Sequence, residues 1–362
     1  MPQAGDPRGE EPTRSSNAHA CSSRRAPRTV TPVAHVKGAA RAHELQRFPS
    51  IERAPAMQSR GLEERPMTQT TTDTRPVAKR AKPASTAQEH HFVGVGDIEI
   101  LYRAWRPEGP PRALVVIAPG FNSHGGHYEW VASQFVRQGL AVYAIDHRGR
   151  GKSDGERFFV KHVLEYVDDL STLVNLAKAR DPDLPVFLLG HSAGGVISCV
   201  YTLEHQDDID GLICESFAFK VPAPNFALTL IKGLSHVVPR AHVLTLPNKY
   251  FSRDPEIVEA LNTDPYIANE RQPSSTVAAL VRADERLAKE FPLITLPVLI
   301  LHGTADKVTI ASGSQFFYDT VGSQDKSLKL YEGHFHDLLN DVDKERVLAD
   351  VESWIDARLS AS

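Results

Sequence analysis

The sequence predicts an α/β fold in which a mostly parallel sheet is flanked by helices on both faces. From Phe92 onward, short apolar runs of strand length alternate with longer runs that carry apolar residues at helical spacing. This alternation is typical of parallel strands joined by crossover helices. Roughly 270 residues follow Phe92, a length that fits one domain of this class.

The predicted elements follow one another in a regular order. The first part contains strands at 98–105, 114–118, 140–145, 186–189 and 211–214, with helices at 128–138, 162–179 and 195–203. The last part contains strands at 298–301 and 328–331 and helices at 312–320 and 344–359. The helix at 162–179 has the plainest pattern, because Tyr166, Leu170, Leu173 and Ala177 recur every three or four residues.

The segment at about 217–291 interrupts this order. It contains seven prolines and a strongly apolar first half. A structureless insertion of this length would be unusual in a compact domain, so we expect a helical cap over the carboxyl-terminal edge of the sheet. Its apolar side chains have two interpretations: packing onto the main domain, or, for some of them, lining an acyl-chain tunnel or facing a membrane or micelle surface. They are Phe226, Leu228, Leu230, Ile231, Leu234, Val237, Val238, Leu244 and Leu246.

Residues 1–90 differ from the rest of the chain in charge and composition. They carry 15 Lys and Arg against 9 Asp and Glu, whereas residues 91–362 carry 26 against 36. Arg, Pro, Ser, Thr and Ala are frequent and show no apolar period, which predicts a disordered basic tail. All three methionines lie in it, so Met67 is a candidate start and residues 1–66 a candidate upstream extension. Acidic residues interrupt the basic charge, and nucleic acid is therefore not an expected partner.

The chain shows no pattern typical of secretion, membrane insertion or a disulfide framework. No run approaches the length of a membrane span, and the tail contains no apolar core of a secretory signal. Cys199 and Cys214 fall in an expected helix and strand and are interpreted as small buried hydrophobes. No spacing of Cys and His indicates a zinc site. We therefore expect a cytoplasmic location and chemistry that needs no metal or organic cofactor.

The motif Gly-His-Ser-Ala-Gly at 190–194 lies between an expected strand and an expected helix. A serine at such a turn is strained and stands at the helix N-terminus, while the flanking glycines avoid collisions with neighbouring elements. The motif alone is weak evidence, because a glycine-rich turn with a solvated serine has the same letters. Ser192 is a candidate nucleophile only if partners lie nearby.

A serine nucleophile requires a base and an acid that orients the base. Asp306 follows one late strand, and His334 and His336 follow the next, at the sheet edge where ligands meet such folds. We favour His336 over His334 as the base, because Gly333 lets the loop turn back toward the nucleophile. We favour Asp306 as the acid over Glu215, which follows an earlier strand.

Two backbone N–H groups are needed to stabilise the oxyanion of a tetrahedral intermediate. One belongs to the residue after the nucleophile, here Ala193, and the other to the loop after the strand at 114–118. Pro119, Gly120 and Phe121 end that strand, so the Phe121 N–H is the second candidate.

These residues and further motifs closely resemble the monoacylglycerol lipase and lysophospholipase branch of the α/β-hydrolases, often grouped with serine aminopeptidase-like hydrolases. The resemblance covers about residues 92–359. It is carried by DHRGRGKS at 146–153, LPVFLLGHSAGG at 184–195, NTDP at 262–265, LILHGTADK at 299–307 and SQDKSLKLYEGHFH at 323–336. It implies an α/β-hydrolase fold with the cap inserted after the sixth strand. It also implies a triad of Ser192, Asp306 and His336 and an oxyanion hole of Phe121 and Ala193.

One stretch departs from the family. Phe121 stands where the family has a small residue, and Ser123 where it has a glutamate that helps to hold a glycerol head group. We therefore expect Phe121 to narrow the oxyanion hole and the head-group specificity to differ, while ester hydrolysis is retained. Asp146 and Arg148 are interpreted as structural residues that tie the loop after their strand.

The leading hypothesis is a serine ester hydrolase that cleaves a monoacyl lipid, either a monoacylglycerol or a lysophospholipid, through an acyl-enzyme intermediate. One alternative is a carboxylesterase or amidase for a small non-lipid substrate. The other is a non-catalytic binding module on a hydrolase fold. The expected partner is a small acyl ester or lipid, with transient membrane or micelle contact through the cap.

Overall fold

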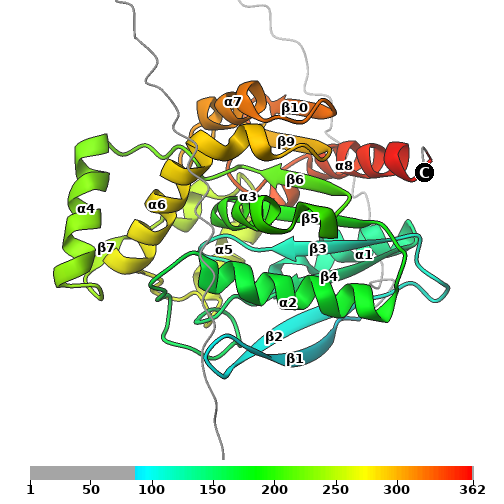
Figure 1. Cartoon of the computed structure of the whole chain (residues 1–362), viewed down its shortest axis with the longest axis horizontal. Coiled ribbons are helices and arrows are strands. Elements are labelled where there is room, and N and C mark those ends of the chain that lie inside the picture. Colours follow the sequence, from blue (N-terminus) through cyan, green and yellow to red (C-terminus); the bar gives the residue numbers. More distant parts are fainter. Residues whose placement is uncertain (1–85, 361–362) are drawn as a thin grey trace, which may run out of the picture. The chain divides into compact units, whose positions relative to one another are not determined.

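The computed structural model describes residues 86–360 (Figure 1). The predictions made for residues 1–85, including the start at Met67, lie outside the described residues. The centre is an eight-stranded sheet with the strand order β1-β2-β4-β3-β5-β6-β9-β10. β2 runs antiparallel to both of its neighbours, and every pairing from β4 to β10 is parallel. The predicted α/β class with a mostly parallel sheet is confirmed.

The elements agree with the predicted order, with shifts of a few residues at their ends. The strands are β1 (Gln88–Gly94), β2 (Ile98–Trp105), β3 (Ala113–Ala118), β4 (Leu140–Ile145), β5 (Val186–His191), β6 (Gly211–Glu215), β9 (Val298–Gly303) and β10 (Lys326–Tyr331). The helices outside the cap are α1 (Glu129–Arg137), α2 (Leu164–Arg180), α3 (Ala193–His205), α7 (Ala311–Thr320) and α8 (Lys344–Leu359). Short 3-10 turns are η1 (Gly125–Tyr128), η2 (Gln206–Asp208), η4 (Phe291–Leu293) and η5 (Leu338–Asn340).

β1 is the one strand of the main sheet that the sequence pattern did not predict. It begins at Gln88, within the last residues of the range that the composition assigned to the tail. Its side chains are exposed or half-buried, because it pairs on one side only and forms the edge of the sheet. An edge strand of this kind lacks the apolar run by which a buried strand is recognised.

Helices cover both faces of the sheet. In β3, Leu114 and Val116 pack into a core with α2 and α3, while Val115 and Ile117 pack into a second core with α1 and α8. Figure 1 shows α2 and α3 in front of the sheet. Burial on both faces explains why the parallel strands are continuous apolar runs.

The cap follows β6, as the resemblance implies. It comprises α4 (Asn225–Val237), η3 (Asn248–Tyr250), α5 (Pro255–Thr263), α6 (Ser274–Glu290) and a small sheet of β7 (His242–Leu244) with β8 (Gln272–Pro273). Its two long helices differ in burial. α6 places Ala279, Ala283 and Leu287 in the main core, whereas no residue of α4 is buried. Packing onto the main domain therefore accounts for α6, but not for the exposed apolar face of α4 at the left edge of Figure 1.

Candidate active site

Ser192 lies at the sharp turn between β5 and α3. Its backbone has φ 56° and ψ −119°, a strained conformation for a residue with a side chain. The Ser192 N–H donates to the Glu215 carbonyl oxygen at 2.9 Å, which fastens the turn to the end of β6. The turn has the strained strand-to-helix form that the motif predicts.

The glycines around this serine occupy positions where a side chain has no room. A Cβ on Gly194 would overlap the carbonyl oxygen of Ala118, and one on Gly190 would lie 2.5 Å from the Ser198 hydroxyl. The start of α3 therefore packs directly against the end of β3. This close packing brings the loop after β3 next to Ser192.

Gly194→Ala is expected to lower the free energy of unfolding by about 3 kcal/mol, because the backbone oxygen of Ala118 cannot move aside cheaply. Gly233→Ala is the matched control. Gly233 also lies in a helix, but a Cβ there would meet nothing within 4 Å. That variant should gain about 0.5–1 kcal/mol from helix propensity. Urea denaturation measures both, and equal effects would contradict the steric explanation.

The structure brings Ser192, His336 and Asp306 into one hydrogen-bonded chain. Ser192 Oγ lies 2.8 Å from Nε2 of His336, and Nδ1 of the same ring lies 2.8 Å from Oδ2 of Asp306. The three residues follow β5, β10 and β9, whose carboxyl ends share one edge of the sheet. The His336 and Asp306 side chains are almost fully buried, so water does not compete for their hydrogen bond.

Asp306 is held by more donors than the sequence motif indicated. The N–H groups of Val308 and Thr309 donate to Oδ1 at 2.7 and 3.0 Å, and the Thr309 hydroxyl donates to Oδ2 at 2.7 Å. Burial alone would raise the pKa of Asp306. The charge of His336 and hydrogen bonds from His302, His336 and Thr309 outweigh burial and hold that pKa well below its ordinary value. The carboxylate therefore stays charged. An aspartate often accepts the backbone N–H two residues later, so the position of Val308 was the one sequence signal for these donors.

The two rival residues lie elsewhere. His334 is buried, and its Nδ1 lies 3.2 Å from the Glu332 carbonyl oxygen. Glu215 accepts the Leu339 N–H at 3.0 Å. Burial and the nearby Asp337 raise the pKa of Glu215 well above its ordinary value, so it is unsuited to serve as a charged partner of the histidine.

The loop after β3 lies against Ser192. A Cβ on Gly120 would stand 2.8 Å from Ser192 Cβ, so the next peptide, at Phe121, is adjacent to the serine. Among the described residues, neither the Phe121 nor the Ala193 backbone N–H donates to another group. The Phe121 ring is turned against the guanidinium of Arg150, 4.2 Å from ring centroid to Cζ.

Asp146 and Arg148 support loops rather than the hydrogen-bonded chain. Asp146 accepts from the backbone N–H groups of Gly125 and Lys152 at 2.8 and 2.9 Å. Arg148 donates twice to Asp169, at 2.7 and 2.8 Å. These contacts fit the structural interpretation of both residues.

Two clusters among residues 86–360 bring histidine and carboxylate groups within reach of a single metal ion. In one, Nε2 of His124 and of His127 lie 2.9 and 2.8 Å from Oδ2 of Asp264 in the cap. His124 Nδ1 accepts the Gly126 N–H, so its proton sits on Nε2 and points at the carboxylate. This cluster is therefore suited to tie the cap to the β3 loop. The other cluster, His191, Glu215 and Asp337, is buried, and the His191 ring lies 4.9 Å from the His336 ring between centroids.

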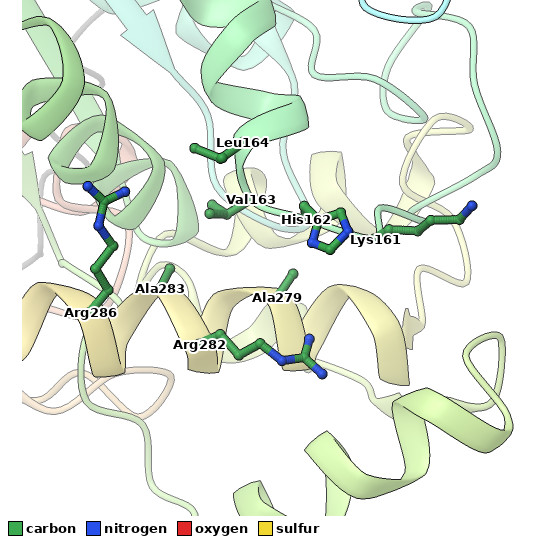
Figure 2. Close-up of a pocket in the computed structure, with 8 residues that line it drawn as sticks. All are labelled: Lys161, His162, Val163, Leu164, Ala279, Arg282, Ala283 and Arg286. Carbon is green, nitrogen blue, oxygen red and sulfur yellow. The ribbon is translucent and has the colours of Figure 1, made fainter. Parts of the chain in front are cut away.

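A separate surface pocket of about 220 Å³ lies between the start of α2 and α6. Figure 2 shows Lys161 and His162 ahead of α2 and Arg282 and Arg286 on α6 around it. None of Ser192, Asp306 and His336 lines it. It is thus not the place where an ester meets the serine.

Comparison with known proteins assigns the chain to a family. A family model described as serine aminopeptidase, S33, matches residues 109–343. The chain belongs to this family of serine hydrolases. Membership of the S33 family, together with the intact Ser–His–Asp chain, leaves a non-catalytic binding module without support.

The relatives of this S33 hydrolase include monoacylglycerol lipases. The monoacylglycerol lipase of Mycolicibacterium smegmatis is 36% identical over 283 residues, which are 76% of this chain and 99% of that protein. The monoglyceride lipase of Rattus norvegicus is 32% identical over 277 residues, which are 75% and 91% of the two chains. A soluble variant of monoglyceride lipase from Saccharomyces cerevisiae, solved with a substrate analog, matches with a TM-score of 0.70 at 22% identity. The match covers 77% of this chain and 97% of the yeast chain, and this likeness shows the α/β-hydrolase fold.

Proposed function

We propose that this serine hydrolase cleaves monoacyl lipids, such as monoacylglycerols or lysophospholipids, through an acyl-enzyme intermediate. The observation that carries the proposal is the hydrogen-bonded chain from Ser192 through His336 to Asp306. The similarity to monoacylglycerol lipases over about three quarters of the chain supports the substrate class.

Ser192 is the nucleophile and His336 is the base. Asp306 orients the His336 ring and stabilises the positive charge that the ring gains. His336 Nε2 takes the hydroxyl proton as Ser192 Oγ attacks the ester carbonyl carbon. The N–H groups of Phe121 and Ala193 donate to the oxyanion that forms. The intermediate collapses by breaking the bond to the alcohol, which receives the proton from His336. Water then attacks the acyl-enzyme by the same route and releases the fatty acid.

A panel of esters tests the substrate class. Purified full-length protein is assayed with monoacylglycerols, lysophosphatidylcholine and p-nitrophenyl esters of increasing chain length. Each methylene that enters an apolar acyl site contributes about 0.8 kcal/mol, so kcat/KM should rise roughly fourfold per carbon until the site is full. Highest activity on acetyl esters would favour the small-substrate carboxylesterase instead, an alternative motivated by Ser123 in place of the family's glutamate.

The apolar face of α4 supports transient contact with a membrane or micelle. Phe226, Leu230 and Val237 are 75%, 69% and 79% exposed and lie on one side of the helix. Exposed large apolar groups that gather on one helix face are typical of surfaces that meet lipid. No helix among residues 86–360 combines the length and the hydropathy that a membrane span requires. The cytoplasmic location stays a prediction of the sequence.

The double variant Phe226→Glu, Leu230→Glu is expected to weaken binding to phosphatidylcholine vesicles by at least about tenfold. Each substitution removes the favourable free energy of transferring an apolar side chain from water into lipid. Co-sedimentation with vesicles measures the change. Leu330→Glu on β10 is the matched control, since Leu330 is 48% exposed but lies away from the cap. Equal loss in both variants would show that the α4 face has no special role.

A further inference from the structure

Arg150 is a buried arginine that contacts Phe121 in the loop after β3. It lies in the loop after β4 and is only 2% exposed. Its guanidinium carbon stands 4.2 Å from the centroid of the Phe121 ring, and Phe121 itself is buried. An arginine can stack its planar face on an aromatic ring while its edge makes hydrogen bonds.

The edge of the same guanidinium is fixed by the cap. Its Nη1 pairs with Glu270, and Nη2 donates to Gln272 Oε1 at 2.8 Å. Gln272 Nε2 in turn donates to the same Glu270 oxygen, and both cap residues are buried. The cap therefore holds the plane of the guanidinium from one side, and Phe121 covers its face.

This buried ion pair is a poor device for stability alone. Taking both charges out of water is costly, and the second carboxylate oxygen of Glu270 has no hydrogen-bond partner among the described residues. A well-packed apolar pair would fill the same space with less penalty. The arrangement is better explained by the position that it imposes on Phe121.

The backbone around Phe121 needs such a support. Gly120 has no side chain to anchor it, and Asn122 has a φ of 51°, in the left-handed region. Asn122 is tied to the cap by its side-chain amide, which donates to the Leu246 carbonyl and to Asn248. Between these two residues, the contact of the Phe121 ring with Arg150 is what can fix the Phe121 peptide.

We infer that Arg150 is a positioning residue, which stacks on Phe121 and so holds the Phe121 N–H where the oxyanion forms. The inference rests on the proposed role of that N–H in ester hydrolysis. It also connects the cap to catalysis, because Glu270 and Gln272 orient Arg150. The Phe121 side chain, which marks the departure from the family, is then part of the support for the oxyanion hole.

Two substitutions and their combination test this positioning. Phe121→Leu removes the aromatic face but keeps the backbone N–H, and Arg150→Lys keeps a cation near Glu270 but has no planar face. Displacing one oxyanion donor is expected to lower kcat/KM roughly tenfold, less than the loss of a donor. Because both changes remove the same contact, kcat/KM of the double variant should be about equal to that of either single variant.

A trifluoromethyl ketone supplies a readout that a merely structural role would not change. It adds reversibly to the serine hydroxyl, and its oxyanion occupies the same hole, so its inhibition constant should rise by the same factor as kcat/KM falls. Phe159→Leu is the matched control. It removes the stack of Phe159 on the exposed Arg240, at 4.9 Å, and should leave both constants unchanged.

The inference is overturned if Phe121→Leu and Arg150→Lys lower the melting temperature but leave both constants at their original values, or if their effects multiply. If Arg150→Lys does not fold, Arg150→Met combined with Glu270→Gln removes both charges together and gives the same comparison. Failure of the proposed function looks different, because the unsubstituted protein would then neither hydrolyse esters nor bind the ketone.

Discussion

Ser192→Ala is expected to lower kcat for ester hydrolysis by about four to six orders of magnitude. The variant removes the oxygen that would form the acyl-enzyme, and no other hydroxyl is bonded to His336 Nε2 among the described residues. The fold should survive, because alanine has the same backbone limits as serine and loses one hydrogen bond. We expect the free energy of unfolding to change by about 1 kcal/mol at most.

Ser198→Ala is the matched control for this substitution. Ser198 lies in α3, the helix that follows Ser192, and is buried, and its hydroxyl has no hydrogen-bond partner among the described residues. Turnover should be retained in this control. A fluorophosphonate probe should label the natural protein and Ser198→Ala but not Ser192→Ala. Ester turnover near the natural rate in Ser192→Ala would refute the assignment of the nucleophile.

The main fold was predictable because most of its strands are buried on both faces. β3 and β4 consist of six apolar residues each, and the amphipathic helix α1 separates them. The strands that escaped prediction lack this signal. β1 forms an exposed edge, while β7 and β8 have three and two residues, too few to show any alternation.

The meeting of Ser192, Asp306 and His336 was predictable from the order of the strands rather than from the sequence motifs around these residues. Parallel strands place their carboxyl ends at one edge, so residues that follow β5, β9 and β10 had to meet there. The choice of His336 over His334, and of Asp306 over Glu215, is different. Burial and donor geometry distinguish these candidates, and a linear motif contains neither.

The contacts of the cap with the loops after β3 and β4 were beyond sequence reasoning. His124 and Asp264 are 140 positions apart, and Arg150 and Glu270 are 120 apart. Such polar side chains are usually exposed, so their burial becomes evident only once the cap is placed. The sequence predicted that Phe121 narrows the oxyanion hole, but it did not predict the contact of the Phe121 ring with Arg150. No pattern in the sequence links the two residues.

Asp306→Asn is expected to lower kcat by about 10⁴-fold, although the new side chain has the same shape. The reason lies in the donors around this residue. The N–H groups of Val308 and Thr309 both point at Oδ1, so the amide must keep its oxygen on that side. Its NH₂ group then faces Nδ1 of His336, which must accept a hydrogen bond and therefore lose its proton.

The remaining proton of the neutral ring moves to Nε2 in this variant, where it faces the Ser192 hydroxyl. A protonated Nε2 cannot accept the serine proton, so the base is lost while the geometry remains. The pH dependence distinguishes this explanation from a distorted site. In the natural protein Asp306 keeps its charge at all ordinary pH values, because its pKa is held far below normal. In Asp306→Asn, part of the activity should return at high pH, where hydroxide can deprotonate the serine. A uniform loss at every pH, or the absence of any loss, would contradict the tautomer argument.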